Sequence, residues 1–205
     1  MKVSGDATLH APIDKVWAAL NDPAVLVRTI PGCERLEATG PDSYRMVIIA
    51  GVASIKGTYA GEVALSDQQH PNSFLMTASG AGGPGTVSTE VRVSLADTGD
   101  GSTRLTYDAD AVVGGVVAGV GQRMLAAVAK KTAGEFFSAV DDVLTGKAVA
   151  APGPAGAVLA EPGVFLAPAA PGRAVSGDFL RGALAGAAIA LAGVLVGGLL
   201  GRRSR

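Results

Sequence analysis

The sequence predicts an α+β domain in which a curved antiparallel sheet wraps around one long C-terminal helix. Three observations lead to this fold class. Short helices come early in the chain, strands with alternating apolar and polar residues follow between residues 44 and 113, and a helical period takes over from Val116 to Leu144. The alternation indicates antiparallel strands with one face in water. The long helix must then cover the apolar face.

The first forty residues predict a strand and two short helices. Residues 1–10 alternate as a half-buried strand does. Pro12 suits the first turn of the following helix, and the run from Asn21 to Pro23 ends that helix. A second short helix follows, and the turn at Pro31-Gly32 leads into the next strand.

The later strands place one set of alternating residues on a shared inner face, and many of these residues are small. Gly and Ala stand where a packed core would use Leu or Ile, at Gly57, Gly61, Ala78, Gly80, Ala109 and Ala111. Protein interiors pack to a density near 0.75. The missing volume is therefore either closed by backbones that approach each other or occupied by a ligand. We interpret it as a ligand cavity, and close helix-on-sheet packing stays open as the alternative.

The candidate ligand-binding residues lie on the inner strand face and on the facing stripe of the long helix. They are Tyr44, Met46, Tyr59, Gly61, Phe74, Met76, Tyr107, Ala109, Val117, Val120, Met124 and Val128. The hydroxyls of the three tyrosines and of Thr89 are the polar groups expected inside. They can orient a carbonyl group without reacting with it.

The sequence offers no set of residues for catalysis or for a metal site. The alternation sends the strand carboxylates, such as Glu62 and Asp110, to the outer face, away from general acid and base work in the pocket. His10 and His70 are expected at the surface without a carboxylate partner. The glycines of residues 80–85 match a dinucleotide-binding pattern, but a strand rather than a helix follows them.

Composition and charge restrict the partners and the compartment. The formal net charge is −1 and 48% of the residues are hydrophobic, so the chain has no basic field for nucleic acid and its apolar excess points to lipid. Cys33 is the only cysteine, which excludes an internal disulfide and fits a reducing cytoplasm. A small buried side chain is the expected role of Cys33.

We divide the chain into residues 1–146, the ligand-binding domain; residues 147–177, a flexible linker rich in Pro, Ala and Gly; and residues 178–205, an apolar membrane-anchoring segment. The domain carries 11 basic and 16 acidic residues, whereas residues 147–205 carry 6 and 2. Two apolar islands interrupt the linker, at Val158-Leu159 and Val164–Leu166. Chance composition is the favoured explanation for them, with a docking segment for a partner as the alternative.

The last segment holds twenty uncharged residues, Gly182–Gly201, which as a helix would span about 30 Å. A full span would carry the terminal arginines across the membrane, against the positive-inside tendency, so shallow insertion stays open beside it. The residues expected to contact the membrane are Leu184, Ile189, Leu191, Val194, Leu195, Leu199, Leu200, Arg202 and Arg203.

Two stretches of the domain resemble the carbon monoxide dehydrogenase CoxG family, which lies within the START-like, helix-grip superfamily. They are HAPIDKVWAALNDPAVLVRTIPGCERLE at residues 10–37 and IKGTYAGEVAL at residues 55–65, and a Pro-rich linker before an apolar C-terminus accompanies them. The resemblance implies a helix-grip fold and a non-enzymatic accessory protein of a molybdenum-containing carbon monoxide dehydrogenase. Flavin, iron-sulfur and molybdenum centres would belong to that partner.

Together, the resemblance, the expected cavity and the apolar tail predict a carrier of a respiratory quinone or a similar isoprenoid lipid. The protein would work at the cytoplasmic face of the bacterial cell membrane, anchored by its C-terminus, and would bind menaquinone or ubiquinone as a ligand with no covalent cofactor. Tyr59 or Tyr107 would donate a hydrogen bond to a quinone carbonyl. The alternative is a purely structural anchor that recruits the dehydrogenase to the membrane without carrying a ligand.

Overall fold

A single antiparallel sheet and three α-helices make up the fold in the computed structural model, which describes residues 1–147 and 163–167. The strands are β1 (Lys2–Leu9), β2 (Cys33–Gly40), β3 (Ser43–Val52), β4 (Ile55–Gln69), β5 (Ser73–Gly82), β6 (Gly85–Asp97), β7 (Thr103–Gly115) and β8 (Val164–Leu166). The helices are α1 (Ile13–Leu20), α2 (Pro23–Thr29), the 3₁₀ helix η1 (Val116–Val120) and α3 (Gln122–Leu144).

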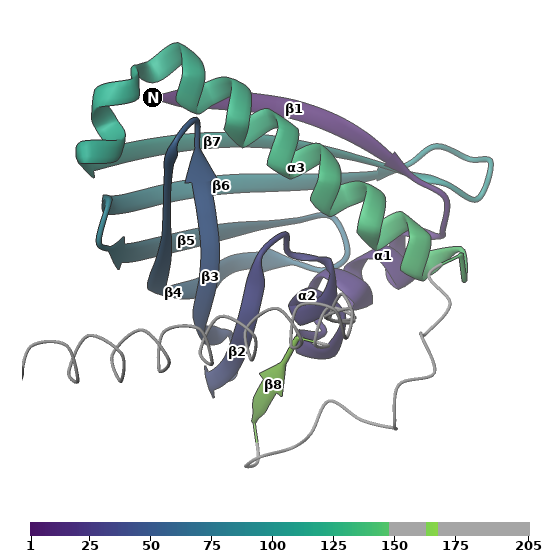
Figure 1. Ribbon diagram of the computed structural model, residues 1–205. Coiled ribbons are helices and arrows are strands. Elements are labelled where there is room, and N and C mark those ends of the chain that lie inside the picture. The colour runs from purple at the N-terminus through teal and green to yellow at the C-terminus, as the bar shows by residue number, and fades with distance from the viewer. Residues whose placement is uncertain (148–162, 168–205) are drawn as a thin grey trace, which may run out of the picture. The chain divides into compact units, whose positions relative to one another are not determined.

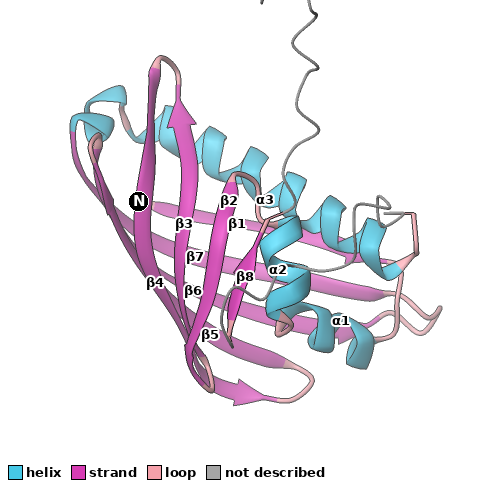
Figure 2. Cartoon of the chain, turned by 60° about the horizontal axis from the view of Figure 1, so that its bottom comes forward, coloured by secondary structure: helices cyan, strands magenta, loops and turns pink. Residues whose placement is uncertain are grey.

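The strands lie in the order β1-β7-β6-β5-β4-β3-β2-β8. Strands β2 to β7 form a meander, and β1 pairs with β7 in a register that runs from Lys2 opposite Asp110 to Leu9 opposite Thr103. The helices α1 and α2 carry the chain from one edge of the meander to the other, because β1 and β2 lie on opposite sides of it. The sheet curves around α3, which lies across its inner face (Figures 1 and 2). This arrangement confirms the predicted α+β class.

Large side chains fill the space between sheet and helix at the end where α3 terminates, which we call the closed end. Leu9, Leu105 and Val140 are fully buried there. The Trp17 ring packs edge-on against Phe74, with 5.6 Å between the ring centroids. The C-terminal half of α3 adds Phe136, Phe137, Val143 and Leu144 to this cluster. These contacts form the main hydrophobic core of the described chain.

An interaction between the end of β1 and α3 fastens the closed end. The backbone amide of His10 donates to Oδ1 of Asp141 over 2.6 Å, and Nδ1 of His10 lies 3.0 Å from Oδ2. Partial burial pushes the pKa of Asp141 up, but the two hydrogen bonds from His10 outweigh it and hold the pKa below its usual value. The prediction that His10 has no carboxylate partner is therefore wrong, because the fold brings together residues 131 positions apart.

The predicted long helix is divided in the structure. Val116–Val120 form η1, and α3 begins at Gln122. Gly115 and Gly121 flank η1 with φ values of +82° and +89°. Glycine adopts this region without steric cost, so these two positions redirect the chain. Val117 and Val120 consequently lie on η1 instead of on the long helix.

A short strand forms within the predicted linker. Val164–Leu166 pair with β2, with Glu37 opposite Val164, and Val164 is buried. The amide of Ala38 donates to the carbonyl of Gly163 over 2.9 Å. The expectation that this apolar island reflects chance composition is wrong, because the outer edge of β2 carries backbone groups that need partners. The island docks on its own chain.

The remainder of the predicted linker, and the whole membrane segment 178–205 with its candidate residues, lie outside the described residues. Within residues 1–147 and 163–167, every helix is too short or too polar to cross a bilayer. Met1–Pro168 form one compact unit of the chain.

Candidate functional site

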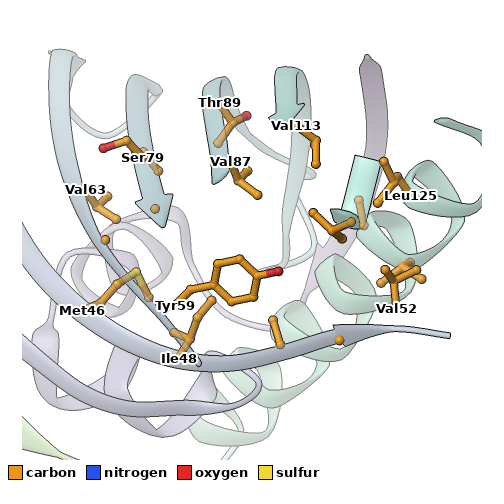
Figure 3. Close-up of a pocket in the computed structure, with 18 of the residues that line it drawn as sticks. Met46, Ile48, Val52, Tyr59, Val63, Ser79, Val87, Thr89, Val113 and Leu125 are labelled. Carbon is orange, nitrogen blue, oxygen red and sulfur yellow. The ribbon is translucent and has the colours of Figure 1, made fainter. Parts of the chain in front are cut away.

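A cavity of about 290 Å³ lies between the inner face of the sheet and the first turns of α3 (Figure 3). We call this half of the molecule the open end. The lining comes from β3 to β7, from η1 and from α3. Its main side chains are Met46, Ile48, Val52, Tyr59, Val63, Val87, Thr89, Val113, Val117, Leu125 and Val128.

Small residues on β4 and β5 account for the space, but they do so in two different ways. Gly61 lies opposite Gly80 and Val63 lies opposite Ala78. A Cβ on Gly61 would stand 2.4 Å from the carbonyl oxygen of Ser79, so the backbone itself has closed in at that point. A Cβ on Gly80 would meet nothing nearer than 3.7 Å. Close backbone approach and true empty volume are therefore both present, at neighbouring positions.

Tyr59 supplies the polar group that faces the cavity. Its side chain is 9% exposed, and Figure 3 shows the ring lying across the cavity with the hydroxyl oxygen toward the interior. Among the described residues no hydrogen-bond partner of this hydroxyl occurs. Thr89 also lines the cavity, but its hydroxyl already donates to the carbonyl of Asp110 over 3.0 Å. The cavity thus combines apolar walls with one available hydroxyl.

Five of the twelve predicted ligand-binding residues line the cavity: Met46, Tyr59, Gly61, Val117 and Val128. Their contact with a ligand remains a prediction. Residues missed as ligand contacts include Val52 and Leu125, which the inward alternation of the strands and the predicted helical stripe did not mark.

The other seven predicted residues lie away from the cavity lining. Phe74, Met76 and Tyr107 belong to the closed end, where the Tyr107 ring lies 5.7 Å from that of Phe137. Tyr44 is buried in a second core cluster with Leu36. The remaining three are Ala109 on β7, Val120 on η1, and Met124, which is 48% exposed. Alternation identifies the inner face of a strand, but it does not tell which end of that face is filled.

The titrating groups with shifted pKa values lie outside the cavity. Burial, followed by the nearby carboxylates of Asp42 and Asp22, raises the pKa of Tyr44. Burial and then Asp6 raise the pKa of Tyr107. Burial also raises the pKa of the Cys33 thiol, which is 7% exposed and therefore behaves as the small buried side chain predicted for it. All three groups stay neutral near pH 7.

The chemistry of the cavity is that of a binding site for an apolar molecule. The lining contains no ionisable side chain other than the phenol of Tyr59. In the part of the chain that the structure describes, no three His, Cys, Asp or Glu side chains gather in a way that could hold a metal ion. What the arrangement offers is apolar contact area and one hydroxyl that can hold a ligand oxygen.

Comparison with known protein families gives a match over most of the domain. The model of the carbon monoxide dehydrogenase CoxG family matches residues 5–145. Among curated proteins, none matches this chain.

Solved structures share the fold. A conserved protein from Geobacillus kaustophilus is 35% identical, with a TM-score of 0.69 over 72% of this chain and 97% of that one. A START superfamily protein from Mycobacterium smegmatis is 17% identical, with a TM-score of 0.56 over 71% and 98%. The Zhui aromatase/cyclase from Streptomyces sp. R1128 is 18% identical, with a TM-score of 0.55 over 75% and 98%. The two more distant structures establish the START-like, helix-grip fold alone.

Proposed function

Because the chain belongs to the carbon monoxide dehydrogenase CoxG family, we propose that it is a non-enzymatic accessory protein of a molybdenum-containing carbon monoxide dehydrogenase. In this proposal it binds an isoprenoid quinone in the cavity at the open end and delivers it to the enzyme. Electrons from carbon monoxide would then enter the respiratory chain. The observation that carries the proposal is the apolar cavity with its one available hydroxyl.

The size of the cavity supports a ligand that is only partly enclosed. Its volume of about 290 Å³ stands at the lower end of the range of about 300 to 1,000 Å³ typical of small-molecule sites. That space suits a quinone ring with the first part of its chain, while the rest of a long isoprenoid tail would extend out of the cavity.

The energetics of exchange with a membrane favour such a carrier. Each buried CH₂ group gains about 0.8 kcal/mol on leaving water. A quinone in a bilayer already has that gain, so an apolar cavity need only match the environment of the bilayer. Transfer in both directions is then close to neutral in free energy, as delivery to a second protein requires.

Tyr59 would fix the ring. Its hydroxyl faces the cavity without a partner among the described residues, so it can donate to a quinone carbonyl. A hydrogen bond of this kind contributes about 1 kcal/mol net. The apolar walls would supply affinity, and the hydroxyl would set the orientation of the carbonyl.

Membrane attachment belongs to the same proposal, through the segment 178–205. A chain that ends at Pro168 keeps the compact unit together with β8. We expect the full chain to sediment with neutral phosphatidylcholine vesicles and the shortened chain to remain in the supernatant. Equal sedimentation of both chains would refute this role of the tail.

Quinone extraction tests the ligand directly. The full chain is incubated with liposomes that contain menaquinone or ubiquinone and is reisolated, and the bound lipid is quantified by mass spectrometry. The variant Ala78→Leu places three additional carbon atoms in the cavity. The matched control is Ala60→Leu, because Ala60 lies on the exposed face of the neighbouring strand.

We expect quinone to be recovered with the unchanged chain and with Ala60→Leu, and most of it to be lost with Ala78→Leu. A chain that carries no quinone in any form would leave a structural anchor for the dehydrogenase as the better account. Equal recovery with both variants would place the ligand outside the cavity.

A further inference from the structure

Exposed apolar side chains gather around the open end. Val112 is 72% exposed, Val116 is 70% exposed and Met124 is 48% exposed. They are three of the four large hydrophobic residues exposed in the described part of the chain. Each directly precedes a residue that lines the cavity. Burial at the open end thus stops abruptly at the cavity wall, and apolar surface continues on its outer side.

The charges of the domain are divided along the same axis. The segments 46–61, 78–89 and 111–129, which supply nearly all of the lining, contain Lys56 and Arg123 and no acidic residue. The rest of residues 1–146 contains nine basic and sixteen acidic residues. Lys56 and Arg123 are exposed, and neither forms an ion pair within residues 1–147 and 163–167. The open end is therefore cationic on a domain that is otherwise anionic.

These residues lie at one end of the molecule. The tip of the β3–β4 hairpin, the last part of β7, η1 and the start of α3 come together at the same end in both views (Figures 1 and 2). We define the rim as Lys56, Val112, Val116, Arg123 and Met124.

We propose that the rim docks on the surface of an anionic lipid bilayer, so that the cavity opens against the membrane. Basic side chains near anionic lipid and apolar side chains at the headgroup level both favour such binding. The acidic remainder of the domain is repelled by the same surface, and this polarity orients the open end toward the bilayer. The contact is made by the domain itself and is separate from both the segment 178–205 and the capture of quinone.

The composition of the rim favours lipid over a protein partner as the occupant. The cores of protein interfaces are enriched in Tyr, Trp and Phe, which anchor in pockets of the other protein. The rim has no aromatic residue. Its apolar members are aliphatic side chains and a methionine on a curved edge, with a cation on either side, and such a surface suits the disordered headgroup region of a bilayer.

A fluorescent probe on the full chain tests this docking. In a Cys33→Ala background, the environment-sensitive dye NBD is attached at Val116→Cys on the rim, and in a matched chain at Ala96→Cys, an exposed position of β6 toward the closed end. Each chain is mixed with quinone-free vesicles of phosphatidylcholine, either alone or with phosphatidylglycerol. Because no quinone is present, the result does not depend on the ligand proposed for the cavity.

We expect the probe at position 116 to brighten and shift to the blue with the anionic vesicles, and the probe at position 96 to stay unchanged. Lys56→Gln and Arg123→Gln should each weaken the vesicle partitioning reported at position 116 by about fivefold, the contribution of one basic side chain near anionic lipid. Equal responses at the two positions would overturn the proposal. A rim probe that ignores vesicles and responds only to added dehydrogenase would also overturn it, in favour of a protein partner.

Discussion

The two ends of the sheet use the same architecture and give opposite results. At the closed end the inner face carries Leu9, Leu105 and Phe74 against Val140 of α3, and the interior is full. At the open end the same strands continue with Gly and Ala, and a cavity of about 290 Å³ remains. Strand alternation and helix coverage are common to both ends. Side-chain volume decides which end is solid, and it does so residue by residue.

The helix α3 repeats the contrast along its own length. Its first turns present Leu125, Val128 and Ala129 to the sheet, whereas its last turns present larger side chains such as Phe136 and Phe137. Dense packing at one end anchors the helix, so the other end can remain hollow without loss of the fold. Stability and binding are thus assigned to different halves of one helix-sheet pair.

The largest expected effect comes from truncating the same residue type at the two ends. Leu105→Ala removes a fully buried side chain at the closed end and should lower the free energy of unfolding by about 3 to 5 kcal/mol. Leu125→Ala changes a half-buried side chain at the cavity and should cost about 1 kcal/mol. Urea denaturation of both variants measures the difference. Equal losses would mean that the two ends are packed alike.

The strand β8 gives the next largest effect. Val164→Asp places a carboxyl group where the structure has a buried side chain, and detachment of the strand should lower the free energy of unfolding by about 2 kcal/mol. Hydrogen exchange should then accelerate at the amide of Ala38, which donates to Gly163. Leu166→Asp is the control, since Leu166 is 38% exposed. If exchange at Ala38 is unchanged in Val164→Asp, the pairing with β2 does not occur in solution.

A smaller effect is expected from Tyr59→Phe at the open end. The hydroxyl has no partner in the described chain, so its removal should leave the free energy of unfolding nearly unchanged. Quinone binding should weaken about fivefold, because one hydrogen bond is worth about 1 kcal/mol. Titration of the full chain with a short-chain quinone measures the affinity. A variant with unchanged affinity would show that Tyr59 does not hold the ligand oxygen.

The smallest effect concerns the fastening of the closed end by His10 and Asp141. Because the pKa of Asp141 is lowered in the folded chain, its contribution to stability is present above the unfolded pKa of about 4 and is lost as the pH falls through the folded value. Asp141→Asn should therefore be less stable than the unchanged chain at pH 7, and the difference should disappear in acid. Thermal denaturation at several pH values measures it. A difference that does not depend on pH would contradict the assignment.

Much of the fold could be predicted from local patterns. The alternation on β3 to β7 fixes which side chains face inward, and the stop at Asn21 to Pro23 separates α1 from α2, as predicted. The break at η1 was missed, because a helical period continues through Val117 and Val120 while glycines on both sides redirect the backbone. The strand β8 was missed because three apolar residues carry no signal until the edge of β2 is known.

The site was predicted in kind more accurately than in place. Small inward residues indicate missing volume, and the structure contains a cavity near Gly61 and Gly80. Phe74 and Tyr107 were nevertheless predicted as lining, since a strand pattern cannot show that Trp17 and Phe137 arrive from distant elements to fill the closed end. The pairing of His10 with Asp141 depends on the same kind of long-range contact.

The central claim is that only the open end accepts a ligand, and methyl NMR of the full chain tests it most directly. With increasing amounts of a water-soluble short-chain naphthoquinone, the methyl signals of Val87, Val113, Val117 and Leu125 should shift and saturate. Those of Leu9, Leu105 and Val140 should remain in place. Shifts confined to the closed end, or no saturable shift at the cavity, would contradict the account.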